Sequence, residues 1–363
     1  LSGGANIYAG GDYMQKAMFP HDFSIQGKGT TGEQMEQVLT EFVNEQQLPV
    51  TKKGVYPYYT MGVTSRAGNQ LDINAAAQKF VTPKTYILAV SEADYQSMTG
   101  KTLDLGDDEV ALYQQGVKLD PKQDLQLAGQ TFKIKEELKE DFIFGHLPDQ
   151  MNMIVPEKIY MVLKNPDQIF SAMTDKYAVN LNYYGWLDTK LSTEEQRNLR
   201  DAYQEKLQQF NQTLPENQAV YGSVTAFDKQ EIKGMLGGMF FIGIFLSIVF
   251  MLGTILIIYY KQISEGYEDR DRFVILQKVG LDEKQIRQTI RKQILIVFFL
   301  PLAFAFIHLT FAYHMLSLIL SALGVLNSAL MLAVTLGVCA IFFISYIIVF
   351  SITSRSYRKI ISM

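Results

Sequence analysis

Three long stretches of the sequence contain no Asp, Glu, Lys or Arg. They cover residues 234–260, 294–320 and 326–352, and each is 27 residues long. A helix that crosses a bilayer needs about 20 predominantly apolar residues, and a helix buried in a water-soluble protein would seldom run this far without a charge. The missing charge therefore predicts three transmembrane helices, whose surplus length is taken up by tilt.

Cysteine is almost absent as well. The single cysteine, Cys339, lies inside the third apolar stretch, so no disulfide can stabilise residues 1–233. An exported domain without disulfides does not depend on an oxidising compartment for folding, which favours a bacterial cell surface.

Catalytic and nucleotide-binding motifs are also missing. Gly100-Lys101-Thr102 ends like a phosphate-binding loop, but Tyr95 stands where that loop needs its first glycine. The sequence has no Gly-x-Ser-x-Gly motif, and the apolar stretches lack the acidic residues of a proton-driven carrier. The pattern thus predicts no catalytic residue and no cofactor, so we do not expect this chain to be an enzyme.

The four histidines do not suggest a metal site. His21 and His146 are isolated in the sequence, with no ligand spacing around them. His308 and His314 lie six residues apart in the second apolar stretch, on different faces of a helix and without a nearby carboxylate. Their role stays open, and we expect no metal.

Charge predicts how the chain is oriented. Basic residues lie between the first and second apolar stretches and again after the third, at Arg355, Arg358 and Lys359. Because positive charge in short loops marks the cytoplasmic side, residues 261–293 and the tail 353–363 are expected inside the cell and residues 1–233 outside. The outer part has 31 acidic and 22 basic residues, which argues against nucleic acid; its acidity could attract a cationic ligand or serve solubility alone.

The start of the chain offers no means of export. There is no initiator methionine, signal peptide or preceding apolar stretch to carry residues 1–233 across a membrane. We therefore expect this chain to be the later part of a longer membrane protein.

Residues 1–233 predict an α+β fold with a mixed or antiparallel sheet. Residues 1–30 are Gly-rich and expected to be irregular, whereas 31–47 has the apolar spacing of an amphipathic helix. Ser91 and Ser192 carry the signals of helix N-caps, for helices at 91–100 and 192–210. A further helix is expected at 167–176, and strands are expected at 55–64, 84–90, 109–113, 131–134, 152–155, 159–163 and 178–187.

The charged connector at 261–293 is the least ordinary part of the membrane half. We expect the helix to continue from the first span, past Tyr259 and Tyr260, into the cytoplasm until Gly280 ends it. A second helix capped by Asp282 is expected to follow, and the two helical segments are expected to lie parallel to or just below the membrane. Such a connector can serve topology alone, but apolar stripes among mixed charges also fit a docking surface for a cytoplasmic protein. In the preceding span, glycines give small-residue faces that suit close packing, either within the chain or at an interface: Gly234, Gly237, Gly238, Gly243 and Gly253.

Two parts of the sequence carry a family resemblance. The pattern ILQKVGLDEKQIRQTIRKQ at 275–293, after a Gly-containing span and before two closely spaced spans, resembles the C-terminal module of FtsX-like ABC transporter permeases. The runs YYKQISEGYEDRDRF and SEADYQSMTGKTLDLGDDEVALYQ look most like the bacitracin-resistance (Bce-type) permeases of Firmicutes. In that family a large extracellular domain precedes the last three of ten spans, so the resemblance covers the whole chain.

The resemblance implies partners and a mode of action. Permeases of this kind pair with a separate cytoplasmic ATPase, a dimer, whose ATP hydrolysis moves the extracellular domain. Bce-type members remove peptide antibiotics such as bacitracin from lipid-linked cell-wall precursors and signal to a membrane histidine kinase. Carried over to this sequence, the ATPase contact would comprise Glu265, Tyr267, Arg270, Arg272, Phe273, Leu276, Gly280 and Lys284.

Two alternatives stay open from the sequence. One is an FtsX-like permease that acts in lipoprotein release or in control of a cell-wall hydrolase. The other is a membrane receptor or scaffold without an ATPase. An acidic concave surface on residues 1–233 would favour cationic peptides as ligands, whereas an exposed apolar groove would favour a lipidated protein.

Overall fold

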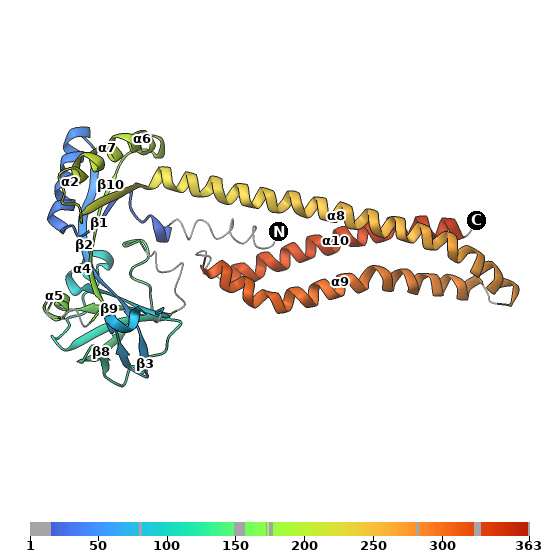
Figure 1. Ribbon diagram of the computed structural model, residues 1–363, viewed down its shortest axis with the longest axis horizontal. Coiled ribbons are helices and arrows are strands. Elements are labelled where there is room, and N and C mark those ends of the chain that lie inside the picture. Colours follow the sequence, from blue (N-terminus) through green and yellow to red (C-terminus); the bar gives the residue numbers. More distant parts are fainter. Residues whose placement is uncertain are drawn as a thin grey trace. The chain divides into compact units, whose positions relative to one another are not determined.

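The computed structural model describes residues 16–79, 82–148, 157–171, 173, 177–280, 283–322 and 328–361. The chain divides into two compact units (Figure 1). One, the sheet domain, is Asp12–Lys233. The other, the helical unit, is made of the described residues from Gly234 onward.

Among the described residues, the sheet domain holds a mixed sheet of eleven strands in the order β11-β1-β10-β2-β5-β9-β6-β8-β7-β4-β3. The strands are β1 (Phe23–Lys28), β2 (Val50–Val63), β3 (Ser65–Ala67), β4 (Gln70–Asp72), β5 (Thr85–Ser91), β6 (Glu109–Gln115), β7 (Leu125–Leu127), β8 (Gln130–Glu137), β9 (Glu157–Leu163), β10 (Val179–Thr189) and β11 (Ala219–Val224). Neighbours are antiparallel except for the parallel pairs β5 with β9, β6 with β8 and β4 with β7. The expectation of an α+β domain with a mixed sheet is confirmed.

Short helices cover parts of this sheet. They are α2 (Gly32–Gln46), α3 (Ala75–Gln78), α4 (Glu92–Thr99), α5 (Pro166–Phe170), α6 (Thr193–Asn198) and α7 (Arg200–Asn211). Helices α2 and α7 pack on the half of the sheet that contains β11, β1 and β10, around Phe23, Phe42 and Tyr203. Burying these three aromatic side chains supplies much of the apolar contact on this side.

The middle of the sheet is buried on both faces. In β9, Ile159 and Met161 point into one apolar cluster, while Tyr160 and Val162 point into another on the opposite face. Side chains alternate between the faces of a strand, so a strand covered on both sides must be apolar at every position. This explains why 159–163 reads as a continuous hydrophobic run.

Two helix caps form where the sequence predicts them, at Ser91 and Ser192, and a third, at Thr31, was not predicted. Thr31 and Gln34 make a reciprocal capping box at the start of α2. Ser91 caps α4, which ends at Gly100 in a left-handed conformation with φ +72°. Ser192 and Glu195 make a second capping box at α6. These signals act over three or four residues, so they do not depend on the rest of the fold.

Several expectations for the sheet domain were wrong. The helix expected at 192–210 is two helices that meet at Leu199, whose N–H bonds back to Glu195, Gln196 and Arg197 and tightens the turn. The helix expected at 167–176 covers only Pro166–Phe170 in the described residues. The segment 1–30, expected to be irregular, contains β1, because pairing with β10 and β11 supplies hydrogen bonds that no local signal reveals. Strands β3, β4, β7 and β11 were also not expected, and 152–155 lies outside the described residues.

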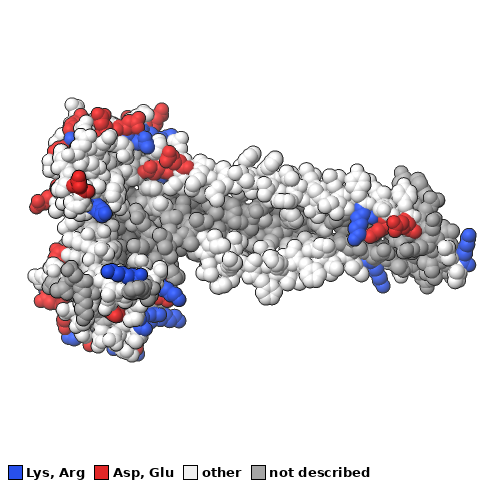
Figure 2. Space-filling view, in the orientation of Figure 1, with Lys and Arg blue, Asp and Glu red and all other residues white. Residues whose placement is uncertain are grey.

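The helical unit contains α9 (Glu283–Ala322), α10 (Ser328–Ile361) and most of α8 (Thr225–Lys278). Each contains a stretch long and apolar enough to cross a membrane, namely Thr225–Glu268, Phe299–Ile319 and Ala329–Thr353. Figure 2 shows charged side chains over the sheet domain and near the connector, and none on the visible face of the apolar stretches between. The three apolar helices expected from the sequence are therefore present.

Packing within the helical unit differs from helix to helix. Helices α9 and α10 contact each other through aromatic pairs such as Phe299 with Phe350 and Phe306 with Phe343. On α8, no described atom outside the local backbone lies within 4 Å of the point where a Cβ would sit on any of the five span glycines. Within the described chain, these glycines therefore do not mediate close packing.

Candidate functional site

The first part of the connector continues the preceding helix, as the sequence predicts. Helix α8 runs unbroken from Thr225 to Lys278, so residues 261–278 are its last turns, and α9 begins directly at Glu283. Gly280 ends the first helix as predicted, with φ +104°, a left-handed conformation that glycine adopts readily. The expected cap at Asp282 lies outside the described residues.

Only part of the expected ATPase contact can be placed side chain by side chain. Glu265 forms an ion pair with Lys261 one helical turn earlier, at 3.8 Å, and Tyr267 is 60% exposed. The backbone of Arg270, Arg272, Phe273 and Leu276 belongs to α8 and that of Lys284 to α9. Their side chains lie outside the described part of the structure.

The described residues do show an exposed apolar strip at this end of α8. Ile275 is 60% exposed, and Val279, which follows the last residue of α8, is 77% exposed. At roughly 100° per residue these two side chains lie about 40° apart around the helix axis, whereas Tyr267 lies about 80° from Ile275. Apolar anchors among charged neighbours are what a protein interface uses at its centre. Sequence reasoning missed Ile275, although it precedes Val279 by four residues, a spacing that places the two side chains one turn apart.

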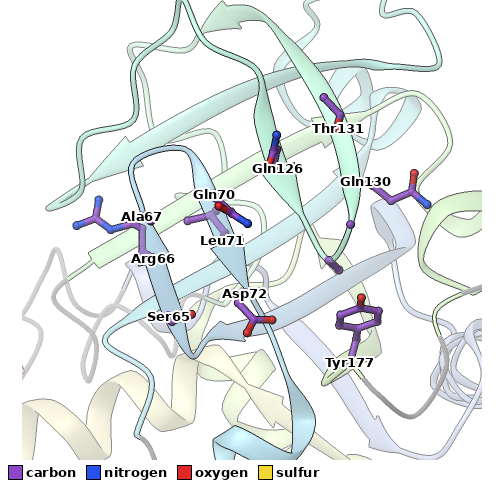
Figure 3. Close-up of a pocket in the computed structure, with 12 residues that line it drawn as sticks. Ser65, Arg66, Ala67, Gln70, Leu71, Asp72, Gln126, Gln130, Thr131 and Tyr177 are labelled. Atoms are coloured by element: carbon purple, nitrogen blue, oxygen red, sulfur yellow. The ribbon is translucent and has the colours of Figure 1, made fainter.

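A second candidate site is a groove of about 610 Å³ at the end of the sheet that carries β3 and β4 (Figure 3). Two hairpins form it, β3–β4 and β7–β8, joined by the parallel pairing of β4 with β7. The lining residues are Ser65, Arg66, Ala67, Gln70, Leu71, Asp72, Gln126, Ala128, Gly129, Gln130, Thr131 and Tyr177. Sequence analysis identified none of them, because the two hairpins are about sixty residues apart in the chain.

The groove is polar and close to neutral. Its charged lining residues are Arg66 and Asp72, and amide and hydroxyl side chains supply most of the remaining hydrogen-bonding groups. This surface is neither the acidic cavity expected for a cationic peptide nor the apolar groove expected for a lipidated protein. Its chemistry therefore does not separate those two ligand classes.

The membrane histidines do not gather ligands. His308 and His314 are both exposed on α9. In the parts of the chain that the structure describes, no group of three His, Cys, Asp or Glu side chains is arranged to hold a metal ion.

Comparison with known proteins assigns the helical part. Residues 244–359 match the family described as FtsX-like permease C-terminal. The ABC transporter permease protein YxdM of Bacillus subtilis (strain 168) is 34% identical over 119 residues, which cover 33% of this chain and 18% of YxdM. The uncharacterized ABC transporter permease YvcS of the same organism is 29% identical over 130 residues, which cover 36% of this chain and 19% of YvcS.

The matches therefore span about a fifth of the length of these curated relatives. A solved structure described as a lipoprotein from Bacillus anthracis overlaps 56% of this chain and 96% of its own, with a TM-score of 0.27 and 6% identity, a likeness too small to carry an argument. What the comparisons identify is therefore the helical part, where residues 244–359 are similar to the C-terminal region of FtsX-like permeases.

Proposed function

We propose that this chain is the C-terminal part of the permease subunit of an ABC transporter that works with a separate cytoplasmic ATPase dimer. The observation that carries the proposal is the match of residues 244–359 to FtsX-like permeases, together with two relatives described as ABC transporter permeases. The chain itself would bind no nucleotide, and its sheet domain would move in response to ATP hydrolysis in the partner ATPase.

Helix α8 supports a mechanical role. Its 54 residues form one helix about 80 Å long at 1.5 Å per residue, which begins directly after strand β11 and ends in the connector. A continuous helix transmits a push or a rotation along its axis, whereas a flexible linker would absorb it. A movement of the connector, caused by ATP hydrolysis in the bound ATPase, would thus be transmitted to the sheet domain.

Orientation is proposed from the distribution of charge. With the basic connector 261–293 and the tail 353–363 in the cytoplasm, the chain crosses a bacterial cell membrane at 234–260, 294–320 and 326–352, and residues 1–233 lie outside. The sheet domain would then be the part that meets an extracellular ligand.

For the substrate, we propose peptide antibiotics that target the cell wall, such as bacitracin, or the lipid-linked precursors that they bind. The support is the resemblance of residues 91–114 and 259–273 to Bce-type permeases and the excess of acidic residues before residue 234, which favours cationic peptides. A membrane histidine kinase is the corresponding signalling partner.

The ATPase contact is proposed at the end of α8 and the start of α9. It comprises Glu265, Tyr267, Arg270, Arg272, Phe273, Leu276, Gly280 and Lys284, with the exposed Ile275 and Val279 added from the structure. A charge placed among apolar anchors would have to be desolvated on binding, so Leu276→Asp should weaken ATPase binding about tenfold or more. Val249→Asp would be no fair control because it disrupts a span; Lys118→Asp, on an exposed loop of the sheet domain, is the matched surface change.

The decisive experiment is purification of the parent membrane protein in mild detergent and identification of what remains bound. We expect a stoichiometric ATPase with vanadate-sensitive hydrolysis, retained by Lys118→Asp and lost from Leu276→Asp. If the folded protein retains no ATPase, the transporter proposal is wrong and a receptor or scaffold replaces it. Equal retention by both variants would instead move the contact away from α8.

A further inference from the structure

The side chain of His21 connects two segments of the sheet domain that are far apart in the sequence. It stands just before β1 and is only 7% exposed. Its Nδ1 lies 3.1 Å from Asp188 Oδ2 and 3.2 Å from Asp188 Oδ1, near the end of β10. Its Nε2 lies 3.2 Å from the main-chain oxygen of His146. The two contacts join segments 125 and 167 residues away from His21.

These contacts define how many protons the ring carries. A carbonyl oxygen can only accept a hydrogen bond, and an ionised carboxylate can also only accept. A neutral imidazole has one N–H, so one ring nitrogen would direct a lone pair at an acceptor. Both contacts are satisfied only when both nitrogens donate, which requires the imidazolium ion.

The surroundings suit that cation. The ring of Trp186 stacks on His21 with centroids 3.9 Å apart and planes 18° apart, and an indole face attracts a positive charge. Burial is the largest influence on Asp188 and raises the pKa of its carboxyl. The hydrogen bond and charge of His21, the Asp22 N–H and Lys52 together outweigh burial, so the pKa lies below its ordinary value and the carboxylate stays ionised.

The other titratable groups around the ring do not compete for this role. Burial, followed by the charge of His21, lowers the pKa of the His146 side chain, which therefore favours its neutral form. Burial raises the pKa of the Tyr56 and Tyr184 phenols, which stay neutral as well. Lys52 on β2 is a cation that acts on both Asp188 and His146.

The same cluster holds the first residue of α8. The Thr225 N–H donates to the main-chain oxygen of Asp22 at 2.9 Å, and the Thr225 hydroxyl donates to the main-chain oxygen of His21. The Asp22 N–H in turn donates to Asp188 Oδ1 at 3.1 Å. The Asp22 carboxylate accepts from the Thr189 N–H at 2.8 Å. Hydrogen bonds thus connect the segment before β1 (His21 and Asp22) with the end of β10 and with the first residue of α8, which we call the root of α8. The Asp188 carboxylate accepts both from the His21 ring and from the Asp22 N–H.

We propose that His21 is a proton-operated latch: the doubly protonated ring ties Asp188 and the 141–148 loop to the segment that holds Thr225, and loss of one ring proton loosens the root of α8. The latch is complete when His21 is charged and Asp188 is ionised. It weakens as pH rises and His21 loses its proton, and again in acid as pH falls through the lowered pKa of Asp188. This device does not depend on the proposed transport function.

Trp186 provides a direct test, because it is the only tryptophan in the chain. A protonated imidazole stacked on an indole quenches its fluorescence. In the full chain in detergent, we expect emission to rise as pH increases through the range of about 5 to 8 in which histidines titrate. The step should vanish in His21→Gln and persist in His146→Gln, since the hydrogen bond of His21 goes to the main-chain oxygen of residue 146.

Hydrogen exchange tests the link to α8. We expect the protection factors of the amides in the first turn of α8 to fall about tenfold or more through the same pH step, after correction for the intrinsic pH dependence of exchange.

Three results would overturn the latch. The first is the absence of a fluorescence step in the wild-type chain, which requires no variant to fold. The second is a step that survives His21→Gln, which would assign it to another group. The third is a step without any change in exchange at the first turn of α8, which would leave His21 titrating without holding the helix.

Discussion

At the scale of single residues, Gly280 is the position where the backbone is most constrained in the connector. Helix α8 ends two residues earlier, and the φ of +104° lies in the left-handed region that residues with a Cβ disfavour. No described atom lies within 4 Å of the point where a Cβ would sit, so the cost of a side chain here is conformational and not steric crowding.

Gly280→Ala should therefore weaken the functional link between this chain and its ATPase without preventing membrane insertion. The strained backbone should cost about 1–2 kcal/mol and shift the link between α8 and α9. The measurement is ATPase retention and ATP hydrolysis by the purified complex, where we expect a loss of several fold. Gly253→Ala, inside α8 with no described atom near the new Cβ, is the control and should behave as wild type. Equal behaviour of both variants would refute a special role for Gly280.

Tyr203 gives a residue-scale test of the sheet domain. Its ring is fully buried against Phe23 and Phe42, and its hydroxyl donates to the main-chain oxygen of Ser24 at 2.9 Å. Tyr203→Phe keeps the ring and removes the donor, so it should lower the free energy of unfolding by about 1–2 kcal/mol. Denaturation followed by Trp186 fluorescence measures this change. Tyr221→Phe, at an exposed tyrosine, should be neutral, and a comparable loss there would contradict the argument.

At the scale of elements, α8 is the feature that joins the two units. It starts within one residue of β11 and continues through its apolar stretch into the connector. Its 54 residues contain no proline, so no residue of the helix lacks a main-chain N–H. Under the proposed function, this continuous helix is the element that carries movement between the connector and the sheet domain.

A break in α8 should leave ATP hydrolysis intact and abolish its effect on antibiotic resistance. Ile232→Pro removes one main-chain hydrogen bond and clashes with the preceding turn, at a cost of about 3 kcal/mol. We expect ATPase retention and hydrolysis to persist while resistance of cells to peptide antibiotics falls at least tenfold. Ile232→Ala keeps the helix and should retain resistance. Full resistance in the proline variant would show that α8 does not transmit the movement.

At the scale of the whole molecule, charge and hydropathy divide the chain in two. Acidic residues outnumber basic ones by nine before residue 234, and basic residues outnumber acidic ones by five after it. The three stretches without charged residues, 234–260, 294–320 and 326–352, all lie after residue 233. This division underlies the proposed orientation, which can be tested without reference to any partner.

Thiol labelling of intact cells should report that orientation. Cys339 is the only cysteine of this chain, so Cys339→Ala, combined with replacement of any cysteine in the rest of the parent protein, gives a background without thiols. A membrane-impermeant maleimide should then label Lys118→Cys on the sheet domain in intact cells. Val279→Cys on the connector should be labelled only after the membrane is permeabilised. The reverse pattern would invert the proposed topology.

Local sequence signals determined much of this architecture. The caps at Thr31, Ser91 and Ser192, the helix stop at Gly280 and the three uncharged stretches each act over a short length of chain, so they could be predicted before any contact was known. The inference of an FtsX-like membrane half also came from contiguous residues, and the family match to 244–359 agrees with it.

Contacts between distant residues decided the rest. Strand β1 and the edge strand β3 are too short or too mixed in pattern to be recognised alone, and they exist because partners far along the chain supply their hydrogen bonds. The groove needs two hairpins to meet, and the His21 cluster needs Asp188, His146 and Thr225 to converge. The sequence by itself therefore determined the caps at Ser91 and Ser192, the helix end at Gly280 and the presence of three long apolar helices. Only the tertiary structure decided which side chains share a site, because that depends on long-range strand pairing and burial.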